Sequence, residues 1–189
     1  DHGNVQFMSQ GNSGQVTSGS IHRDVPGLSY QANVTLRNSA LLVGANRGTS
    51  QAPNPLSIPW NPGEVIVRPG WQQPVLLRWR SPEDGLVTLR TVLRDMEPTV
   101  GDGVSYTLVH TTGTGPKNST KTVVAEGLLH NAEMRDLNFG GKEILVKRND
   151  TLTLVLNPLG EEKNLMKSDG DATKLDWRIY LEEMPVRLN

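Results

Sequence analysis

The stretch PVLLRWRSPEDGLVTLRTVLRD, residues 74–95, decides the fold class. Val75, Leu77 and Trp79 occupy every second position before a Ser-Pro-Glu-Asp-Gly turn, and Leu89 continues the alternation after it. A period of two is typical of strands that bury one face, and proline followed by glycine is typical of a tight turn. The stretch therefore predicts two β-strands, each with one apolar face and one polar face.

Similar short runs recur along the chain between 19 glycines and 12 prolines, which separate them. Long helical patterns are missing. Candidate strands lie at residues 5–8, 30–36, 40–43, 104–108, 122–125, 142–147, 151–156 and 175–181. The Arg-Asn-Asp segment at 148–150 predicts a hairpin between the two strands that flank it. About nine or ten strands at regular spacing predict an all-β fold, a two-sheet antiparallel sandwich of jelly-roll type.

The 189 residues are expected to form a single domain, in which residues 1–64 are irregular and loop-rich and residues 65–184 form the main sandwich. The absence of cysteine excludes disulfides, thiolate metal sites and a cysteine nucleophile, and favours a bacterial source. The 19 basic and 20 acidic residues do not form the basic footprint of a nucleic-acid binder. No apolar run is long enough for membrane insertion.

Several segments resemble a known class of domain: Pro74–Trp79, Ser81–Leu89, Gly101–Val104, Asn149–Leu154 and Asp171–Ile179. Over about residues 65–181 the chain resembles the carbohydrate-binding-module-like β-sandwich domains of secreted and surface bacterial proteins. The resemblance implies a secreted or cell-surface location and a polysaccharide or oligosaccharide partner. Because the first residues lack the pattern of a signal peptide, we expect a piece of a longer chain that is linked to other domains.

Basic residues occupy the outward positions of the predicted strands, where the alternation leaves the apolar residues inside. These residues are Arg78, Arg80, Arg90, Arg94 and Arg178, and Tyr180 shares the pattern. The prediction is that four strands present them on one sheet surface. Since the guanidinium fork binds carboxylate or sulfate with two hydrogen bonds, such a surface favours an acidic glycan. The alternative is a solvated face that is charged for solubility.

Aromatic residues add further ligand candidates. Trp60 and Trp71 lie in proline- and glycine-rich segments, where they either stack on sugar rings or close the open end of the sandwich. Tyr106 is a third candidate. A β-sandwich polysaccharide lyase would need a tyrosine or histidine base with an arginine, and Tyr106, His110 and Arg90 are residues of those types.

Two acidic segments could hold a structural calcium ion, although no cofactor is required. Asp169 and Asp171 flank a glycine, and Asp102 precedes one. Calcium takes six to eight oxygen ligands, of which closely spaced carboxylates supply the charged ones. The alternative is a plain polar turn, because the spaced acids of an EF-hand loop are missing.

The sequence carries no catalytic motif. It has no nucleophile elbow and no phosphate-binding glycine loop, and its four histidines lie far apart. The favoured function is therefore a non-catalytic carbohydrate-binding domain of a polysaccharide-processing or surface protein. A polysaccharide lyase or hydrolase, and a structural spacer or adhesion domain without a glycan ligand, are the alternatives.

Overall fold

The computed structural model describes residues 5–9, 28–33, 41–46, 61, 64–69, 74–97, 101–113, 115, 118–137, 143–159 and 171–183. These residues form twelve strands, and among them there is no helix of the length and apolarity that a membrane span requires. The strands are β1 (Val5–Ser9), β2 (Leu28–Asn33), β3 (Leu41–Asn46), β4 (Val65–Arg68), β5 (Val75–Arg80), β6 (Gly85–Asp95), β7 (Val104–Thr112), β8 (Thr120–Leu129), β9 (Met134–Asp136), β10 (Ile144–Val146), β11 (Thr151–Pro158) and β12 (Thr173–Glu183).

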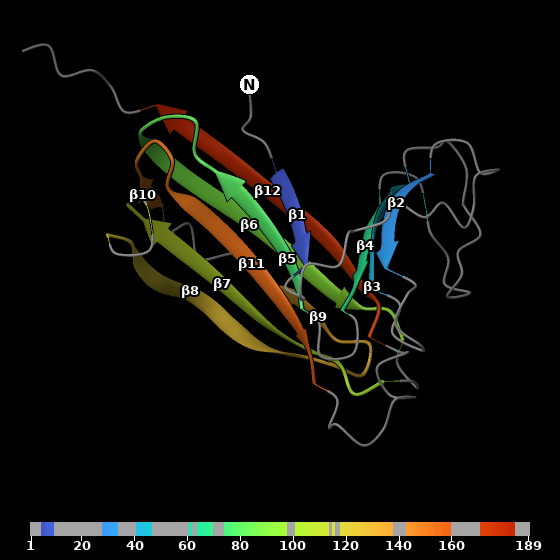
Figure 1. Cartoon of the computed structure of the whole chain (residues 1–189). Coiled ribbons are helices and arrows are strands. Elements are labelled where there is room, and N and C mark those ends of the chain that lie inside the picture. Colours follow the sequence, from blue (N-terminus) through green and yellow to red (C-terminus); the bar gives the residue numbers. More distant parts are fainter. Residues whose placement is uncertain are drawn as a thin grey trace, which may run out of the picture.

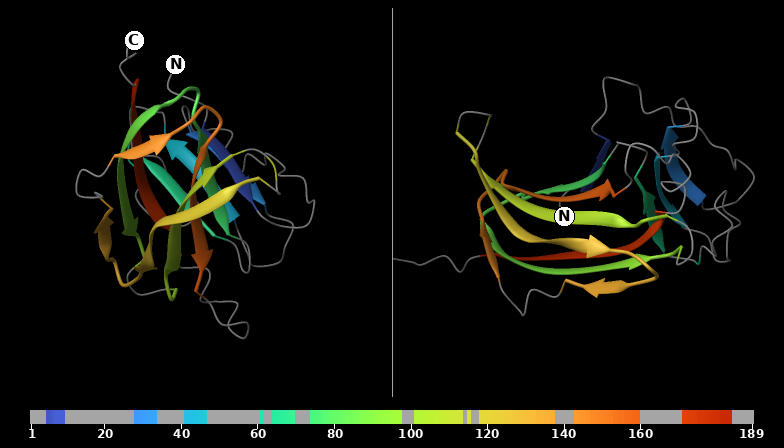
Figure 2. Two further views of the ribbon diagram at one scale, coloured as in Figure 1. Left: turned by 90° about the vertical axis from the view of Figure 1, so that its left-hand side faces the viewer. Right: turned by 90° about the horizontal axis from the view of Figure 1, so that it is seen from below.

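The strands pair antiparallel in two sheets that form the layers of a sandwich (Figure 1, Figure 2). The five-stranded sheet has the order β1-β5-β11-β7-β8. The seven-stranded sheet has the order β10-β6-β12-β4-β3-β2, and β9 also pairs with β6. Strands β4 to β12 thus divide into β5-β11-β7-β8 and β10-β6-β12-β4, which is the arrangement of a jelly roll. The predicted all-β, two-sheet sandwich is confirmed.

Two turns that the sequence predicts connect one sheet to the other. Residues 81–84 lead from β5 into β6, and residues 148–150 lead from β10 into β11. The predicted hairpin at 148–150 is therefore wrong. The N–H of Ser81 donates to the Asp150 carbonyl at 2.8 Å, and the N–H of Asn149 donates to the Ser81 carbonyl at 2.9 Å, so the two crossings are bonded together. A turn signal marks where a strand ends, but core packing decides which strand it pairs with.

The apolar positions of the alternation form the core between the sheets. Leu77, Trp79, Leu89 and Leu154 are at most 2 % exposed, as the sequence predicts. Val75, Leu93, Leu108, Leu152 and Leu156 belong to the same cluster, against which Trp177 and Ile179 pack while partly buried. Each fully buried side chain of this kind contributes about 1.5–3 kcal/mol to folding. The burial of one face fixes the register of each strand, and so determines which side chains point outward.

The N-terminal part of the chain contributes three strands to the sandwich. β1 pairs with β5 at one edge of the five-stranded sheet, and β3 pairs with β4 and with β2 to extend the other sheet. The region expected to be irregular thus supplies strands to both layers.

Candidate functional site

A row of polar side chains crosses four strands on the outer face of the five-stranded sheet. Thr151 of β11 lies opposite Arg80 of β5 on one side and opposite Thr111 of β7 on the other. Thr111 in turn lies opposite Lys121 of β8. Residues directly opposite each other in paired strands project to the same face. Because Trp79 and Leu152 point into the core, this row points outward.

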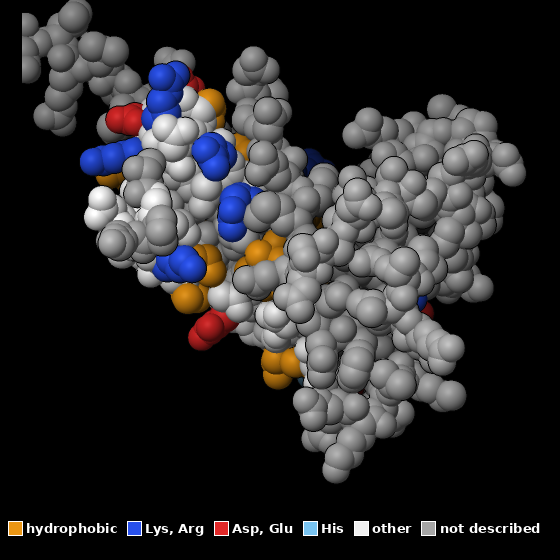
Figure 3. Space-filling model, in the orientation of Figure 1, with side chains coloured by type: hydrophobic (Ala, Val, Ile, Leu, Met, Phe, Trp, Pro, Cys, Tyr) orange, Lys and Arg blue, Asp and Glu red, His pale blue; other side chains and the backbone are white. Residues whose placement is uncertain are grey.

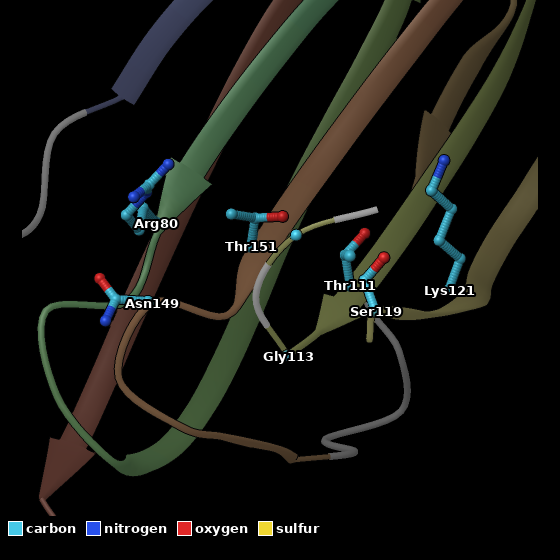
Figure 4. Close-up of a pocket in the computed structure, with 8 residues that line it drawn as sticks. Arg80, Thr111, Gly113, Ser119, Lys121, Asn149 and Thr151 are labelled. Carbon is cyan, nitrogen blue, oxygen red and sulfur yellow. The ribbon is translucent and has the colours of Figure 1, made fainter. Parts of the chain in front are cut away.

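The row lines a cleft of about 610 Å³. Its lining residues are Arg80, Thr111, Gly113, Gly115, Ser119, Lys121, Asn149 and Thr151. In Figure 4 the side chains of Arg80 and Lys121 stand on opposite sides, and those of Thr151, Thr111 and Ser119 lie between them. The cleft therefore offers two cations, three hydroxyls and one amide to a ligand.

The two cations of the cleft are available to a ligand. Arg80 and Lys121 are exposed, and neither forms an ion pair within the described part of the chain. Hydroxyl and amide groups both donate and accept hydrogen bonds, as the hydroxyls of a sugar do, while guanidinium and ammonium groups bind carboxylate or sulfate. Basic side chains are visible on this side of the molecule in Figure 3, with hydrophobic ones beside them.

A second row lies two residues further along the strands. Nε of Arg78 donates to Oγ1 of Thr153 at 3.2 Å, which fixes the guanidinium against the sheet. Thr153 lies opposite Val109, which lies opposite Val123, and Val123 is 53 % exposed. The outer face beside the cleft thus carries an arginine and two valines. We call the outer face that carries both rows the cleft face.

The buried carboxylate of Asp150 holds the loops that shape the cleft. Its Oδ1 accepts from the N–H of Gly113 at 3.3 Å, and its Oδ2 accepts from the N–H of Lys147 at 2.9 Å. Nε2 of His110 lies 3.4 Å from Oδ2. Gly113 and Asn149 have positive φ angles of 82° and 74°, which glycine and asparagine adopt most readily. Asp150 therefore fixes two loops without lining the cleft itself.

The predicted arginine array is divided between the two outer faces. Arg78 lies on the five-stranded sheet, whereas Arg90 of β6 and both Arg178 and Tyr180 of β12 lie on the seven-stranded sheet. The prediction of one common surface is wrong, because the turn at 81–84 takes the chain from one sheet to the other. We call the outer face with Arg90, Arg178 and Tyr180 the arginine face.

Acidic side chains accompany the cations of the seven-stranded sheet. Nε of Arg178 donates to Oδ1 of Asp176 at 2.9 Å, and Lys174 pairs with Glu64. Hydrogen bonding to Asp176, and then to Tyr180, raises the pKa of Arg178. Burial acts to raise the pKa of Glu64, but hydrogen bonds with Asn61 and Lys174 bring it below its usual value.

Tyr106 is not on a ligand-accessible surface. Its side chain is 7 % exposed and belongs to the core cluster, so its selection as a ligand residue is corrected by the structure. It lies opposite Leu156 and Gly127, and it points inward as Val104 and Leu108 of the same strand do. Trp60, Trp71 and Asp169 lie outside the described residues.

Asp171 is buried, with 1 % of its surface exposed, and its Oδ1 accepts from the N–H of Gly103 at 3.0 Å. Burial raises its pKa to about 7; the charge of Asp102 acts in the same direction, while the N–H of Gly103 opposes it. Within the described ranges no group of three or more acids or histidines is placed to hold a metal ion. Calcium binding at Asp171 stays a prediction.

The strand pattern did not identify five cleft residues: Thr111, Ser119, Lys121, Asn149 and Thr151. The signals that could have found them are the Gly/Thr-rich loop after β7 and the Arg-Asn-Asp turn before β11. Only the pairing of β11 between β5 and β7 brings these segments together.

No protein-family model matches the chain, and no curated protein matches it. One similar solved structure is that of the carbohydrate-binding module TmCBM61 in complex with β-1,4-galactotriose. The likeness covers 96 % of this chain and 91 % of that one, at 11 % identity and a TM-score of 0.39. The likeness is distant.

Proposed function

We propose that this chain is a non-catalytic carbohydrate-binding domain whose ligand lies in the cleft of the five-stranded sheet. The observation that carries the proposal is the row of Arg80, Thr151, Thr111 and Lys121, which a single cleft joins across four strands. Ligand sites are concave and carry a few convergent polar groups, and this cleft has both properties. We place the domain in a secreted or cell-surface bacterial protein, beside other domains that process or display polysaccharide.

The proposed ligand is an acidic glycan. Arg80 and Lys121 have no acidic partner within the described part of the chain, so a carboxylate or sulfate can take that place. Thr111, Ser119 and Thr151 add hydroxyls that exchange hydrogen bonds with sugar hydroxyls. In the proposed complex, the charged group of the ligand contacts the cations at the sides of the cleft. The sugar hydroxyls contact the neutral hydroxyls along its floor.

Binding without cleavage is the reading that the cleft chemistry favours. None of the described lining residues is an acid, a tyrosine or a histidine, the side chains that supply general acid–base catalysis to glycan cleavage. The lyase set is also not assembled, because Tyr106 lies in the core while Arg90 lies on the outer face of the other sheet. No cofactor enters this proposal.

Binding to immobilised acidic and neutral polysaccharides tests the function. We expect retention on acidic polymers, which remain intact. The double variant Arg80→Ala/Lys121→Ala should bind on the order of 30-fold more weakly, since two partly exposed charge contacts contribute roughly 1 kcal/mol each. Arg135→Ala is the matched control, because Arg135 is an exposed arginine that pairs with Glu133 away from the cleft.

Three outcomes would contradict the proposal. Unsaturated, ultraviolet-absorbing products would make the domain a lyase. The absence of binding to every acidic and neutral polymer by folded protein would favour a spacer or adhesion domain. Equal losses in the double variant and in Arg135→Ala would mean that the cleft is not the site.

A further inference from the structure

Two arginines stand directly opposite each other on the arginine face. Arg178 of β12 is the register partner of Arg90 of β6, and both side chains are exposed. Directly paired residues of antiparallel strands have Cα atoms about 4.5–5.5 Å apart, so the two arginine side chains leave the sheet side by side. Like charges at this spacing are unfavourable unless an anion lies between them. The arrangement therefore calls for a counter-charge.

The acid that contacts this pair of arginines, Asp176, answers only part of their charge. Asp176 lies on the same strand as Arg178 and accepts from its Nε at 2.9 Å, which leaves the terminal nitrogens of the guanidinium free of that contact. Arg90 has no ion-pair partner among the residues that the structure describes. Asp136 and Glu182 also lie on this face, opposite Val92 and Leu86, but among the described residues Asp176 is the only acid that pairs with either arginine.

The neighbours of Arg178 orient its guanidinium. Asp176 holds the Nε side, and Tyr180, which also hydrogen-bonds with Arg178, lies two residues further along the strand. Tyr180 is 53 % exposed and so presents a ring beside the arginine pair. Planar groups of this kind stack on the apolar face of a sugar ring, while the free guanidinium nitrogens bind an oxyanion.

We propose that Arg90, Arg178 and Tyr180 form a second anion-binding site, for a sulfate or carboxylate group of an acidic glycan, on the sheet opposite the cleft. The oxyanion lies between the two guanidinium groups and the sugar ring lies against Tyr180. The inference rests on the proposed function only for the identity of the polymer. Because the two sites lie on opposite faces, one domain binds two glycan chains or two separate segments of one chain.

The second site is the weaker of the two. Arg90, Arg178 and Tyr180 are exposed to water and salt, which reduces the contribution of each charge. We expect its dissociation constant to be on the order of tenfold higher than that of the cleft.

A titration with a chondroitin sulfate hexasaccharide, followed by nuclear magnetic resonance, tests the inference. The Nε–H signals of Arg90 and Arg178 report on the second site, and the amides of Thr111 and Thr151 report on the cleft. We expect both sets to shift with separate saturation curves and a stoichiometry of two. Arg90→Ala should remove the second curve and leave the cleft curve unchanged.

Arg94→Ala is the matched control, because Arg94 is an exposed arginine on the same strand and the same face, but it lies opposite Lys174. Loss of the second curve in Arg94→Ala as well would indicate general attraction to the positive face and overturn the inference. Saturation at one ligand, with only cleft signals shifting, would also overturn it and leave the proposed function standing. Shifts at the arginine signals alone would support the second site and contradict the cleft.

Discussion

The two outer faces of this sandwich carry similar charges in different surroundings. On the cleft face, Arg80 and Lys121 flank a hollow whose described lining includes hydroxyls and no acid. On the arginine face, the cations lie beside Asp176 and Glu64. The difference teaches that basic residues alone do not define a glycan site. Concavity and neutral hydrogen-bonding groups distinguish a sugar ligand from a simple counter-ion.

A carboxylate placed within the cleft row would make the cleft face resemble the other one. Thr151→Asp puts an acid directly between Arg80 and Thr111, where it pairs with the arginine and repels an anionic ligand. We expect affinity for an acidic polysaccharide to fall on the order of 30-fold, equivalent to about 2 kcal/mol, measured by calorimetry. Thr107→Asp, on the same face but four residues along β7 from Thr111, is the control for added charge, and an equal loss there would contradict a cleft centred on Thr151.

A change of pH tests the contribution of Asp171, which lies away from both faces, to the stability of the fold. The pKa of Asp171, raised to about 7 from the 3.8 of an unperturbed aspartate, means that folded protein binds more protons than unfolded protein between those values. Stability should therefore fall as pH rises through this window, by up to about 1.4 kcal/mol per pH unit where the difference is one proton. Asp171→Asn should flatten that slope in urea unfolding and leave glycan affinity unchanged.

Asp136→Asn removes an exposed carboxylate and serves as the control for the pH series. An unchanged slope in Asp171→Asn would refute the assignment to Asp171. A rise in the thermal midpoint of the wild type on addition of calcium, absent in Asp171→Asn, would instead support the calcium ion that the sequence predicts.

Salt should weaken binding at the two faces to different extents, and this is the smallest of the expected effects. Raising the ionic strength from 0.1 to 0.5 M shortens the Debye length to less than about 5 Å, so exposed charge contacts weaken several-fold. Hydrogen bonds from Thr111, Ser119 and Thr151 are not screened in this way, and the cleft should retain part of its affinity. Equal salt dependence of the cleft and arginine-face signals would mean that the hydroxyls contribute nothing.

The strands and the core were predictable because alternation is a local property. Leu77, Trp79 and Leu89 are buried where the pattern puts them, since one buried face fixes each strand. The pattern also identifies the outward arginines correctly. The pattern does not show which sheet a strand belongs to, because Arg78 and Arg90 follow the same alternation on either side of a crossing between the sheets.

The cleft could not be read from the sequence for the same reason. Arg80, Thr111 and Thr151 become neighbours only when β11 enters between β5 and β7. Tyr106 was predicted to contact the ligand but lies in the core. An aromatic residue in a strand fits a ligand face or a core equally well until its pairing is known. Long-range pairing, which depends on the packing of the whole core, supplies the missing information.

The two bonded crossings have a consequence for the order of folding. The N–H of Arg148 donates to Oδ1 of Asp84 at 2.7 Å and its Nε donates to the carbonyl of Pro82 at 2.7 Å, across sequence separations of 64 and 66 residues. Closing so long a loop is slow and precedes any gain from the contact. The cleft is therefore completed late, after β11 has docked. A nascent or truncated chain that ends before residue 151 would lack the β11 side of the cleft, so the cleft is present only once the fold is finished.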